Sequence, residues 1–198
     1  MEVGEVNPWV AKAIILLASI VMVAIRAPHG QRRRGIRPVR SRKGKLEIVL
    51  LTIAWLAFFL PLVWIATPVL ASADYALRPV PLLAGTVCLT LGLWLFHQSH
   101  ADLGANWSIT LEVLEKHTLV TQGVYRRVRH PMYTALLLYS VGQALVLPNY
   151  VAGLSSGVTM ALLVALRIGP EERMMLEEFG KDYQEYMALT KCLVPGVW

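Results

Sequence analysis

The sequence is poor in charged residues and in cysteine, and each shortage excludes a class of protein. Charged residues make up 16% of the 198 residues and hydrophobic residues 56%, so the chain holds more apolar side chain than one soluble domain of this length can bury. Its two cysteines, Cys88 and Cys192, are too few for a disulfide framework and belong to no cluster with the spacing of a zinc site. We therefore expect neither a water-soluble globule nor a metal centre.

The signature motifs of soluble nucleotide-dependent enzymes are also missing. Closely spaced glycines of the form G-x-G, which the phosphate-binding turn of a Rossmann-type fold requires, occur nowhere in the chain. The P-loop, H-E-x-x-H and G-x-S-x-G patterns are absent as well. Any catalytic site must therefore be built on another kind of scaffold.

Acidic residues are absent between Arg26 and Lys45, where nine of the 19 lysines and arginines lie. The rest of the chain holds the other 10 basic residues and all 13 acidic ones, so the net charge of +6 is a local feature. We expect no nucleic-acid partner. The basic segment 26–45 instead indicates membrane topology and contact with anionic lipids.

Long apolar stretches are what the sequence has in abundance. A bilayer-spanning helix needs roughly 20 mostly apolar residues, and we expect five spans, at about 9–25, 47–70, 80–98, 132–147 and 150–168. Only Pro148 and Asn149 join the last two, which predicts an antiparallel hairpin. Gly153 and Gly157 have the spacing for close helix packing, which we expect inside the bundle of a monomer. The predicted fold class is all-α: an integral membrane bundle of five transmembrane helices forming one domain, 1–198.

The distribution of Lys and Arg predicts the orientation. Five crossings place segments 26–46, 99–131 and 169–198 on one side, and with Arg167 at the membrane edge that side carries 17 of the 19 basic residues. The positive-inside rule assigns it to the cytoplasm. The N-terminus, 71–79 and the 148–149 turn then lie on the opposite side, which has too few residues for a site.

Two cytoplasmic segments contain enough polar residues for a site. One is the 99–131 loop, and the other is the tail that begins at Arg167. Hydrophobic residues recur in the tail at steps of three or four, which predicts an amphipathic helix interrupted near Gly180, either along the headgroups or folded back over the bundle. These residues are Met175, Phe179, Tyr183, Tyr186 and Met187.

Each motif in these segments has an ordinary structural interpretation. Arg-His-Pro before an apolar run is typical of a helix start, and Arg167 is typical of an interfacial anchor that pairs with Glu171 four residues later, although Pro170 disturbs a regular turn there. Read together, the motifs resemble the isoprenylcysteine carboxyl methyltransferase family and, more loosely, the phospholipid N-methyltransferases. The resemblance covers about residues 90–195 and rests on His117-Thr118-Leu119-Val120, Gly123-Val124-Tyr125, Arg129-His130-Pro131-Met132-Tyr133, Arg167-x-x-x-Glu171-Glu172 and Glu178-Phe179-Gly180.

The resemblance implies a catalytic core over 80–198, preceded by two helices and the basic loop 26–46 within 1–79. It implies that Arg167 is tied to the methyl acceptor and that the cytoplasmic loop and the C-terminal helix form the S-adenosylmethionine site. The residues expected to line that site are Glu112, His117, Thr118, Leu119, Val120, Tyr125, His130, Pro131, Met132, Tyr133 and Glu171. Eukaryotic members have additional spans, so this chain resembles the short prokaryotic members, for which the acceptor is open.

The expected function is methyl transfer from S-adenosylmethionine to a lipophilic acceptor that arrives from the bilayer, with carboxyl O-methylation ahead of N-methylation of a lipid amine. Arg167 would hold an anionic acceptor. Glu171 would bind the cofactor, neutralise Arg167 or act as a base, and the sequence leaves these open. The alternatives are a sterol-type reductase that uses a nicotinamide cofactor, and a channel, transporter subunit or scaffold, which lacks support because no span carries an ionisable residue at its middle.

Overall fold

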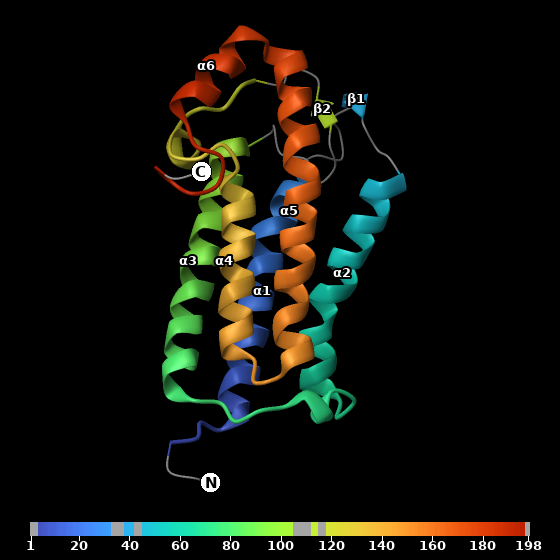
Figure 1. Cartoon of the computed structure of the whole chain (residues 1–198), viewed down its shortest axis with the longest axis vertical. Helices are drawn as coiled ribbons and strands as arrows, with labels where there is room; N and C mark the ends of the chain where they lie inside the picture. Colours follow the sequence, from blue (N-terminus) through green and yellow to red (C-terminus); the bar gives the residue numbers. More distant parts are fainter. Residues whose placement is uncertain (1–3, 33–37, 42–44, 105–111, 115–117, 197–198) are drawn as a thin grey trace.

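The computed structural model describes residues 4–32, 38–41, 45–104, 112–114 and 118–196. Within these ranges the chain forms a bundle of long helices that run along one axis, with a short helix across one end (Figure 1). The helices are α1 Pro8–Arg32, α2 Lys45–Ala66, α3 Pro79–Leu103, α4 Pro131–Val146, α5 Tyr150–Phe179 and α6 Lys181–Leu189. The all-α membrane bundle predicted from the sequence is confirmed.

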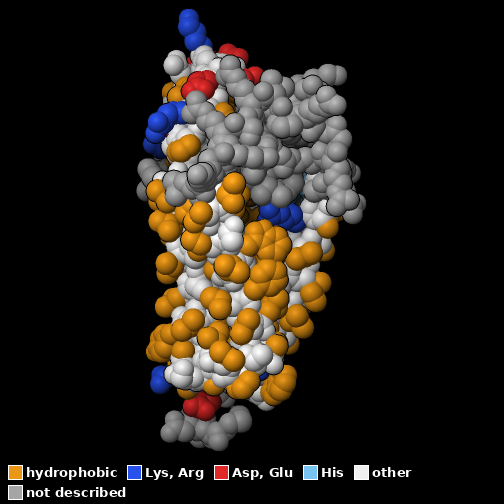
Figure 2. All heavy atoms as spheres, turned by 90° about the vertical axis from the view of Figure 1, so that its right-hand side faces the viewer, with side chains coloured by type: hydrophobic (Ala, Val, Ile, Leu, Met, Phe, Trp, Pro, Cys, Tyr) orange, Lys and Arg blue, Asp and Glu red, His pale blue; other side chains and the backbone are white. Residues whose placement is uncertain are grey.

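Among the residues that the structure describes, four helices are long and apolar enough to cross a membrane: Pro8–His29, Ile48–Ala66, Pro79–Leu103 and Tyr150–Phe179. The fifth predicted span, α4, is apolar but has 16 residues, slightly fewer than a typical transmembrane helix. Large apolar side chains point outward from the helices, among them Leu17, Leu56, Leu83 and Val158. Figure 2 shows such side chains covering the middle of one face, with charged side chains toward the two ends. Such an apolar surface suits the hydrocarbon core of a bilayer.

Helix α5 is longer than the sequence indicated. The expected span ended near residue 168 with a disturbed turn at Pro170, but α5 runs through Pro170 to Phe179, a length of 30 residues. The expected interruption at Gly180 is confirmed, because Gly180 has φ of 54°, a conformation that glycine adopts readily. Helix α6 then folds back over the bundle with Tyr183 and Tyr186 buried.

A small antiparallel ribbon joins the two polar loops at the α6 end. Strand β1, Pro38–Ser41, pairs with β2, Glu112–Leu114, with Arg40 opposite Val113. The sequence did not predict these strands, because three or four residues give no recognisable alternation. The ribbon ties the segment after α1 to the segment after α3 (Figure 1).

Helices α3 and α4 pack through glycines. A Cβ added to Gly142 would lie 2.7 Å from the Leu89 nitrogen and 2.8 Å from the Gly85 oxygen. A Cβ on Gly92 would lie 2.9 Å from the Tyr139 nitrogen. Glycine therefore allows the two backbones to approach closely, as in other membrane helix pairs. Gly153 packs against α4 in the same way, with Leu147 oxygen 3.2 Å from such a Cβ, so it lies inside the bundle as expected.

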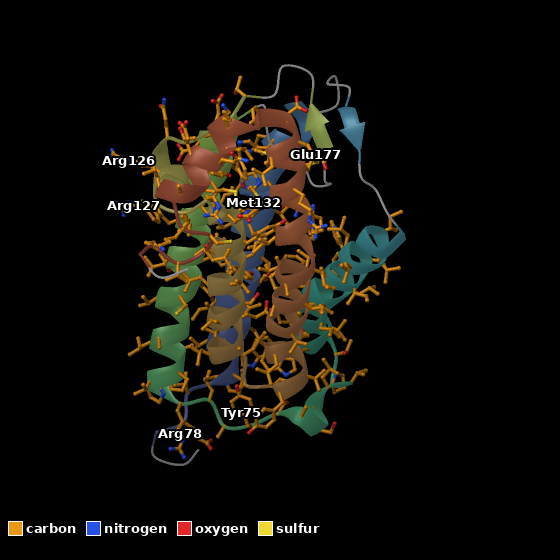
Figure 3. The ribbon with its side chains drawn as sticks, turned by 45° about the horizontal axis from the view of Figure 1, so that its top comes forward. Tyr75, Arg78, Arg126, Arg127, Met132 and Glu177 are labelled. Carbon is orange, nitrogen blue, oxygen red and sulfur yellow. The ribbon has the colours of Figure 1, made fainter. Side chains whose placement is uncertain are left out.

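The opposite end of the bundle is closed by hydrogen bonds. Asp74 Oδ1 accepts from Trp64 Nε1 and from Asn149 Nδ2, each at 2.7 Å. Asn149 Oδ1 also caps α5 by accepting from the Ala152 nitrogen at 2.8 Å, and the Tyr75 hydroxyl donates to Leu147 oxygen at 2.9 Å. Figure 3 places Tyr75 at this end, far from the labelled Met132. A cavity opens near the other end.

Candidate functional site

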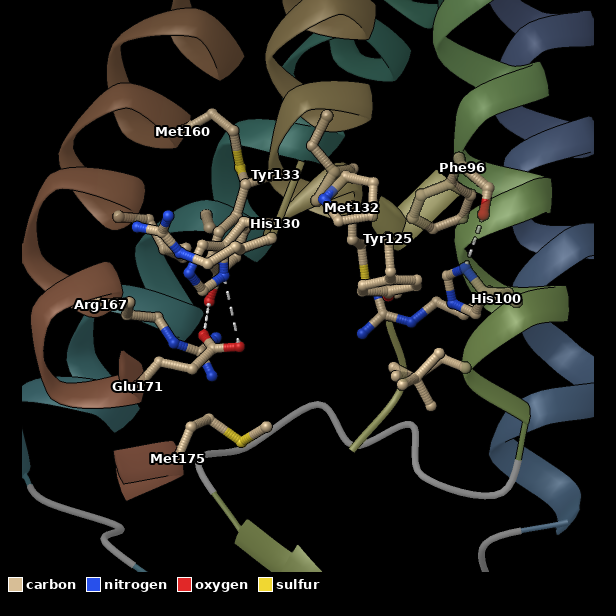
Figure 4. Close-up of a pocket in the computed structure, with 18 of the residues that line it drawn as sticks. Phe96, His100, Tyr125, His130, Met132, Tyr133, Met160, Arg167, Glu171 and Met175 are labelled. Carbon is tan, nitrogen blue, oxygen red and sulfur yellow. Dashed lines mark hydrogen bonds and ion pairs between the residues drawn. The ribbon is translucent and has the colours of Figure 1, made fainter. Parts of the chain in front are cut away.

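A cavity of about 320 Å³ lies between the helices toward the α6 end. Figure 4 shows Arg167 and Glu171 on one wall and Phe96 and His100 on the opposite wall, with Tyr125 and Met132 between them. Most of the lining is apolar or aromatic, with a small number of polar groups. A volume of this order and this composition are typical of small-molecule sites.

The loop before α4 is held by backbone contacts from several elements. At Gly123, φ is 60°, and a Cβ there would clash with Asp102, whose Oδ2 accepts from the Val124 nitrogen at 2.8 Å. Tyr125 follows in a short 3₁₀ helix, η4 Gly123–Arg126, and is buried. Burial raises the pKa of the Tyr125 phenol, and the negative charge of Glu171 raises it further. The phenol is therefore protonated at neutral pH.

The segment after α6 lies along the start of α4 and fixes its position. The backbone nitrogens of Arg129 and His130 donate to Lys191 and Cys192 oxygens at 2.8 and 3.1 Å. Thr134 Oγ1 donates to Leu193 oxygen at 2.7 Å. Pro131 then occupies the first turn of α4, where a missing N–H costs nothing. These bonds place His130 at the edge of the cavity.

Glu171 connects the two polar stretches of the sequence. The Tyr133 hydroxyl donates to Glu171 Oε2 at 2.5 Å, and His130 Nδ1 lies 3.8 Å from Glu171 Oε1. The rings of His130 and Tyr133 stack with centroids 5.5 Å apart. Thus the start of α4 and the middle of α5, separated by 38 residues, meet at one wall of the cavity, as the sequence predicted.

Glu172, the next residue, faces a different set of partners. Its Oε1 accepts from Arg129 Nε at 2.8 Å and Nη2 at 2.7 Å, and lies 3.3 Å from His130 Nε2. Arg129 Nη1 also donates to Thr190 oxygen. Burial disfavours the charged guanidinium of Arg129, but the hydrogen bond and negative charge of Glu172 outweigh burial and raise its pKa. Arg129 and Glu172 therefore form an ion pair beside the cavity, with Arg129 in its lining.

His130, Glu172 and Cys192 offer ligand atoms within 4.8 Å of one another, a spacing that a metal ion could use. The Glu172 oxygen in this group already holds the Arg129 guanidinium at 2.7 Å. A cation placed there would be repelled by that guanidinium. We therefore assign this group to structure and propose no metal for it.

The structure brings together ten of the twelve residues that the sequence predicted for the site. Glu112 lies in β2, but its side chain is outside the described residues, as is the whole of His117. The ten that line the cavity are Thr118, Leu119, Val120, Tyr125, His130, Pro131, Met132, Tyr133, Arg167 and Glu171. Their roles stay predictions.

Sequence reasoning missed the wall that the first two helices contribute. Met22, Val23 and Arg26 of α1 line the cavity, as do Trp55 and Phe58 of α2. Such residues carry no motif, because apolar side chains in a span look alike whichever way they face. The sequence signal for Arg26 was present but was interpreted as part of the basic segment 26–45.

The middle of the chain is similar in sequence to known proteins. Residues 83–177 match the family model of the isoprenylcysteine carboxyl methyltransferase family. A protein-S-isoprenylcysteine O-methyltransferase B of Arabidopsis thaliana is 39% identical over 83 residues, which are 42% of each chain. The protein-S-isoprenylcysteine O-methyltransferase of Homo sapiens is 32% identical over 104 residues, 52% of this chain and 37% of the human one. The chain thus spans less than half the length of these relatives.

A solved structure of the eukaryotic intramembrane Ras methyltransferase ICMT superimposes with a TM-score of 0.54, covering 80% of this chain and 55% of that one at 24% identity. At this identity, the likeness shows a shared fold. Together with the four helices of spanning length, it identifies a multi-pass membrane protein. The segment 83–177, which includes most of α3, all of α4 and most of α5, is thus similar in sequence to the isoprenylcysteine carboxyl methyltransferase family, which confirms the resemblance seen in the motifs.

Proposed function

We propose that this protein transfers a methyl group from S-adenosylmethionine to the carboxylate of a lipophilic acceptor, such as a prenylcysteine. The observation that carries the proposal is the shared cavity, in which the Tyr133–Glu171 hydrogen bond and buried Arg167 adjoin an apolar wall from α1 and α2. The match over residues 83–177 supports the same reaction class. The names of the relatives support a prenylcysteine as the model acceptor.

The residues present suit S-adenosylmethionine. Its ammonium and hydroxyl groups need acceptors, which Glu171 and His130 provide, while Tyr125 and Met132 offer apolar faces to a flat base. When bound, S-adenosylmethionine supplies an electrophilic methyl group on a positively charged sulfur. No basic side chain is needed to activate an ionised carboxylate, so the residues of this chain have only to bind, orient and exclude water.

Arg167 is the residue that we assign to the acceptor. Its side chain is buried, with 8% of the residue exposed, and it lies one turn before Glu171 on α5. A planar guanidinium can hold a carboxylate by two parallel hydrogen bonds, which leaves one oxygen lone pair directed at the methyl group. Holding the reactants in this geometry, away from water, accelerates an in-line displacement without any covalent enzyme intermediate.

An apolar tail can reach this position from the bilayer. Trp55 and Val23 line the cavity, and 55% and 58% of their surfaces are exposed. We therefore place the entrance for the tail beside these two residues, on the side of the cavity formed by α1 and α2. Its lining also includes five of the seven methionines, Met22, Met132, Met160, Met174 and Met175, whose flexible side chains adapt to irregular apolar ligands.

The α6 end of the bundle is the end that we propose to face the cytoplasm, with the N-terminus on the opposite side. Most of the described basic residues lie at this end, including Arg126 and Arg127, which point away from the bundle in Figure 3, whereas Arg78 and Lys12 lie at the other end. Segment 26–45 would contact anionic lipids there, although residues 33–37 and 42–44 lie outside the described part of the chain. We propose a monomer as the functional unit.

Binding experiments test the proposal first. Calorimetry on the purified protein in neutral detergent should show binding of S-adenosylmethionine and S-adenosylhomocysteine. Transfer of radiolabelled methyl should favour a prenylcysteine analogue over phosphatidylethanolamine. Tight NADPH binding without binding of either sulfur compound would indicate a reductase, and methylation of phosphatidylethanolamine alone would indicate N-methyl transfer.

Two substitutions then separate the roles within the site. His130→Ala should weaken S-adenosylhomocysteine binding, because His130 lies against Glu171 and stacks on Tyr133. Arg167→Ala should leave that binding nearly unchanged and impair turnover of an anionic acceptor. The reverse pattern would contradict both assignments.

A further inference from the structure

A second cleft lies at the end of the bundle opposite α6, between the start of α1 and the end of α2 (Figure 1). Its volume is about 390 Å³, which is within the range of small-molecule sites. Lys12, Trp64, Ile65, Thr67 and Asp74 are among the described residues that line it. None of its described lining residues belongs to the lining of the methyl-transfer cavity, so this Lys12 cleft is a separate place in the molecule.

Lys12 of α1 bends toward α2 at this cleft. Its Nζ donates to the Ile65 oxygen at 3.2 Å and lies 4.9 Å from the centroid of the Trp9 ring and 5.1 Å from that of Trp64. A lysine near the end of a span ordinarily extends toward the headgroups, whereas this half-buried ammonium is held against a buried indole. An ammonium carries three N–H donors, and in the described part of the chain Ile65 accepts one of them. Donors therefore stay available to a ligand.

Asp74 brings a negative charge to the same cleft. Its Oδ1 accepts from Trp64 Nε1 and from Asn149 Nδ2, each at 2.7 Å, and the residue is exposed. Trp64 thus holds both charges, with the ammonium over its ring face and the carboxylate at its ring nitrogen. The two side chains share this indole and are not hydrogen-bonded to each other. One positive and one negative group therefore face the cleft at separate points.

We propose that the Lys12 cleft binds the headgroup of a phospholipid that carries a primary ammonium, such as phosphatidylethanolamine. Lys12 donates to the phosphate, and Asp74 accepts from the ammonium. A pair of side chains with no net charge complements a zwitterion better than an anion. A choline headgroup has no N–H to donate to Asp74, and a glycerol headgroup has no positive charge, so both fit this arrangement less well.

The position of the cleft favours a lipid over a soluble phosphate compound. The spanning part of α1 begins at Pro8 and that of α2 ends at Ala66, so the cleft lies where the hydrocarbon core gives way to the phosphates. Exposed apolar side chains surround it, among them Trp9, Val63 and Val69. A headgroup held in the cleft can therefore keep its acyl chains against an apolar surface, with the tryptophans at the level of the headgroups.

Native mass spectrometry on the delipidated full chain in neutral detergent tests the headgroup first. The probes are phosphatidylethanolamine, phosphatidylcholine and phosphatidylglycerol with identical acyl chains. Phosphatidylethanolamine should bind about fivefold more tightly than either of the others, the size of one partly exposed charge interaction. Equal affinity for the three lipids would overturn the inference. This comparison uses the wild-type protein, so it does not depend on the folding of a variant.

Substitutions then test the two charges. Lys12→Gln should weaken phosphatidylethanolamine binding about tenfold, the size of a charge-assisted hydrogen bond, and Lys12→Arg, which keeps the charge, should lose less. Asp74→Asn keeps an oxygen for Trp64 and Asn149, and it should remove the preference for phosphatidylethanolamine over phosphatidylcholine. Arg78→Gln is the control, because Arg78 is exposed at the same end of the bundle and outside the cleft lining, so it should change nothing (Figure 3).

Three outcomes of these experiments would overturn the assignment. The first is unchanged phosphatidylethanolamine affinity in Lys12→Gln. The second is displacement of the lipid by inorganic phosphate at equal concentration, which would indicate an anion site. The third is an equal loss of phosphatidylethanolamine and S-adenosylhomocysteine binding in Lys12→Gln, which would indicate a general effect on the fold. The proposed function stands in the first two cases, because its cavity is at the other end of the bundle, and it fails separately if the wild-type protein does not bind S-adenosylhomocysteine.

Discussion

At the scale of residues, Glu171 and Glu172 are neighbours in sequence with different environments. Successive side chains on a helix point about 100° apart. This rotation directs Glu171 toward the cavity and Glu172 toward a different set of partners. Glu171 receives the Tyr133 hydroxyl at the cavity. Glu172 instead receives Arg129 and lies against His130 Nε2 and Cys192. One carboxylate is thus available to a ligand, and the other holds α4, α5 and the chain after α6 together.

Glu172→Ala should therefore destabilise the protein, whereas Glu171→Gln should chiefly weaken cofactor binding. Removing one partner of a buried ion pair costs about 3 kcal/mol, because the other charge is left uncompensated. Reversible denaturation in micelles measures the loss. Glu172→Gln, which keeps a hydrogen-bond acceptor, should lose less, and Glu185→Gln, an exposed acid on α6, should lose nothing. Wild-type stability in Glu172→Ala would contradict the assignment.

The reactivity of the Cys192 thiol depends on pH and on the charge of its neighbour Glu172. Burial raises the pKa of its thiol, and the negative charge of Glu172 raises it further. A higher pKa means less thiolate at any given pH, so alkylation should begin at a higher pH than in the unfolded chain. The measurement is the rate of iodoacetamide labelling in a Cys88→Ser background by mass spectrometry. Glu172→Gln should move that onset to lower pH, and an onset equal to that of the unfolded chain would contradict the prediction.

At the scale of elements, the sequence predicted which stretches are helical better than where the helices end. The expected span 80–98 is α3 Pro79–Leu103 and the expected 132–147 is α4 Pro131–Val146, because apolar runs of this length have few other stable states in a bilayer. The sequence predicted a span that ends near 168 and an amphipathic helix in the tail up to Gly180, but not that the two form one helix, α5, which runs to Phe179. Hydropathy falls where the membrane ends, and Pro170 indicated a disturbed turn there, so nothing in the sequence showed that the helix continues unbroken.

The sequence predicted close helix packing through glycines, but it did not predict which glycines make the closest contacts between helices. The sequence drew attention to Gly153 and Gly157, whose spacing is four residues, whereas the tightest contacts between helices are those of Gly85, Gly92 and Gly142 between α3 and α4. Gly142 has no glycine partner four residues away in sequence. Its partner is Gly85 on another helix, which only the tertiary structure identifies.

Gly142→Ala and Gly157→Ala should therefore differ sharply. The added methyl at residue 142 meets backbone atoms at 2.7 and 2.8 Å, which cannot move without separating α3 from α4, whereas at residue 157 the nearest atom, Ser140 Cβ, is 4.0 Å away. Overpacking of this kind costs about 1–3 kcal/mol. Thermal unfolding in detergent should show a lower Tm for Gly142→Ala and an unchanged Tm for Gly157→Ala. Equal Tm values in the two variants would show that α3 and α4 separate easily.

In the molecule as a whole, the site has two walls, and one of them could be predicted from the sequence. The wall formed by His130, Tyr133, Arg167 and Glu171 was predictable, because polar residues stand out at the edges of apolar spans and their order resembles one family. The wall formed by α1 and α2 was not, because Met22, Val23, Trp55 and Phe58 are ordinary residues of a span. Whether such a side chain meets lipid or a cavity depends on the rotation and tilt of its helix, which neighbouring helices decide.

Trp55 tests whether the α1–α2 wall receives the acceptor tail. It lines the cavity and is 55% exposed, and Trp94 on α3 is 56% exposed without being part of the lining. Trp55→Ala should raise KM for a long-chain prenylcysteine about tenfold, which corresponds to about 1.4 kcal/mol of lost apolar contact. KM for a short-chain analogue and the affinity for S-adenosylhomocysteine should not change, because the polar wall is intact. Trp94→Ala removes a side chain of equal size and exposure from the bundle surface, so it should change none of these values. If the two variants raised KM alike, the effect would belong to general contact with the detergent or lipid, and the tail would have to enter elsewhere.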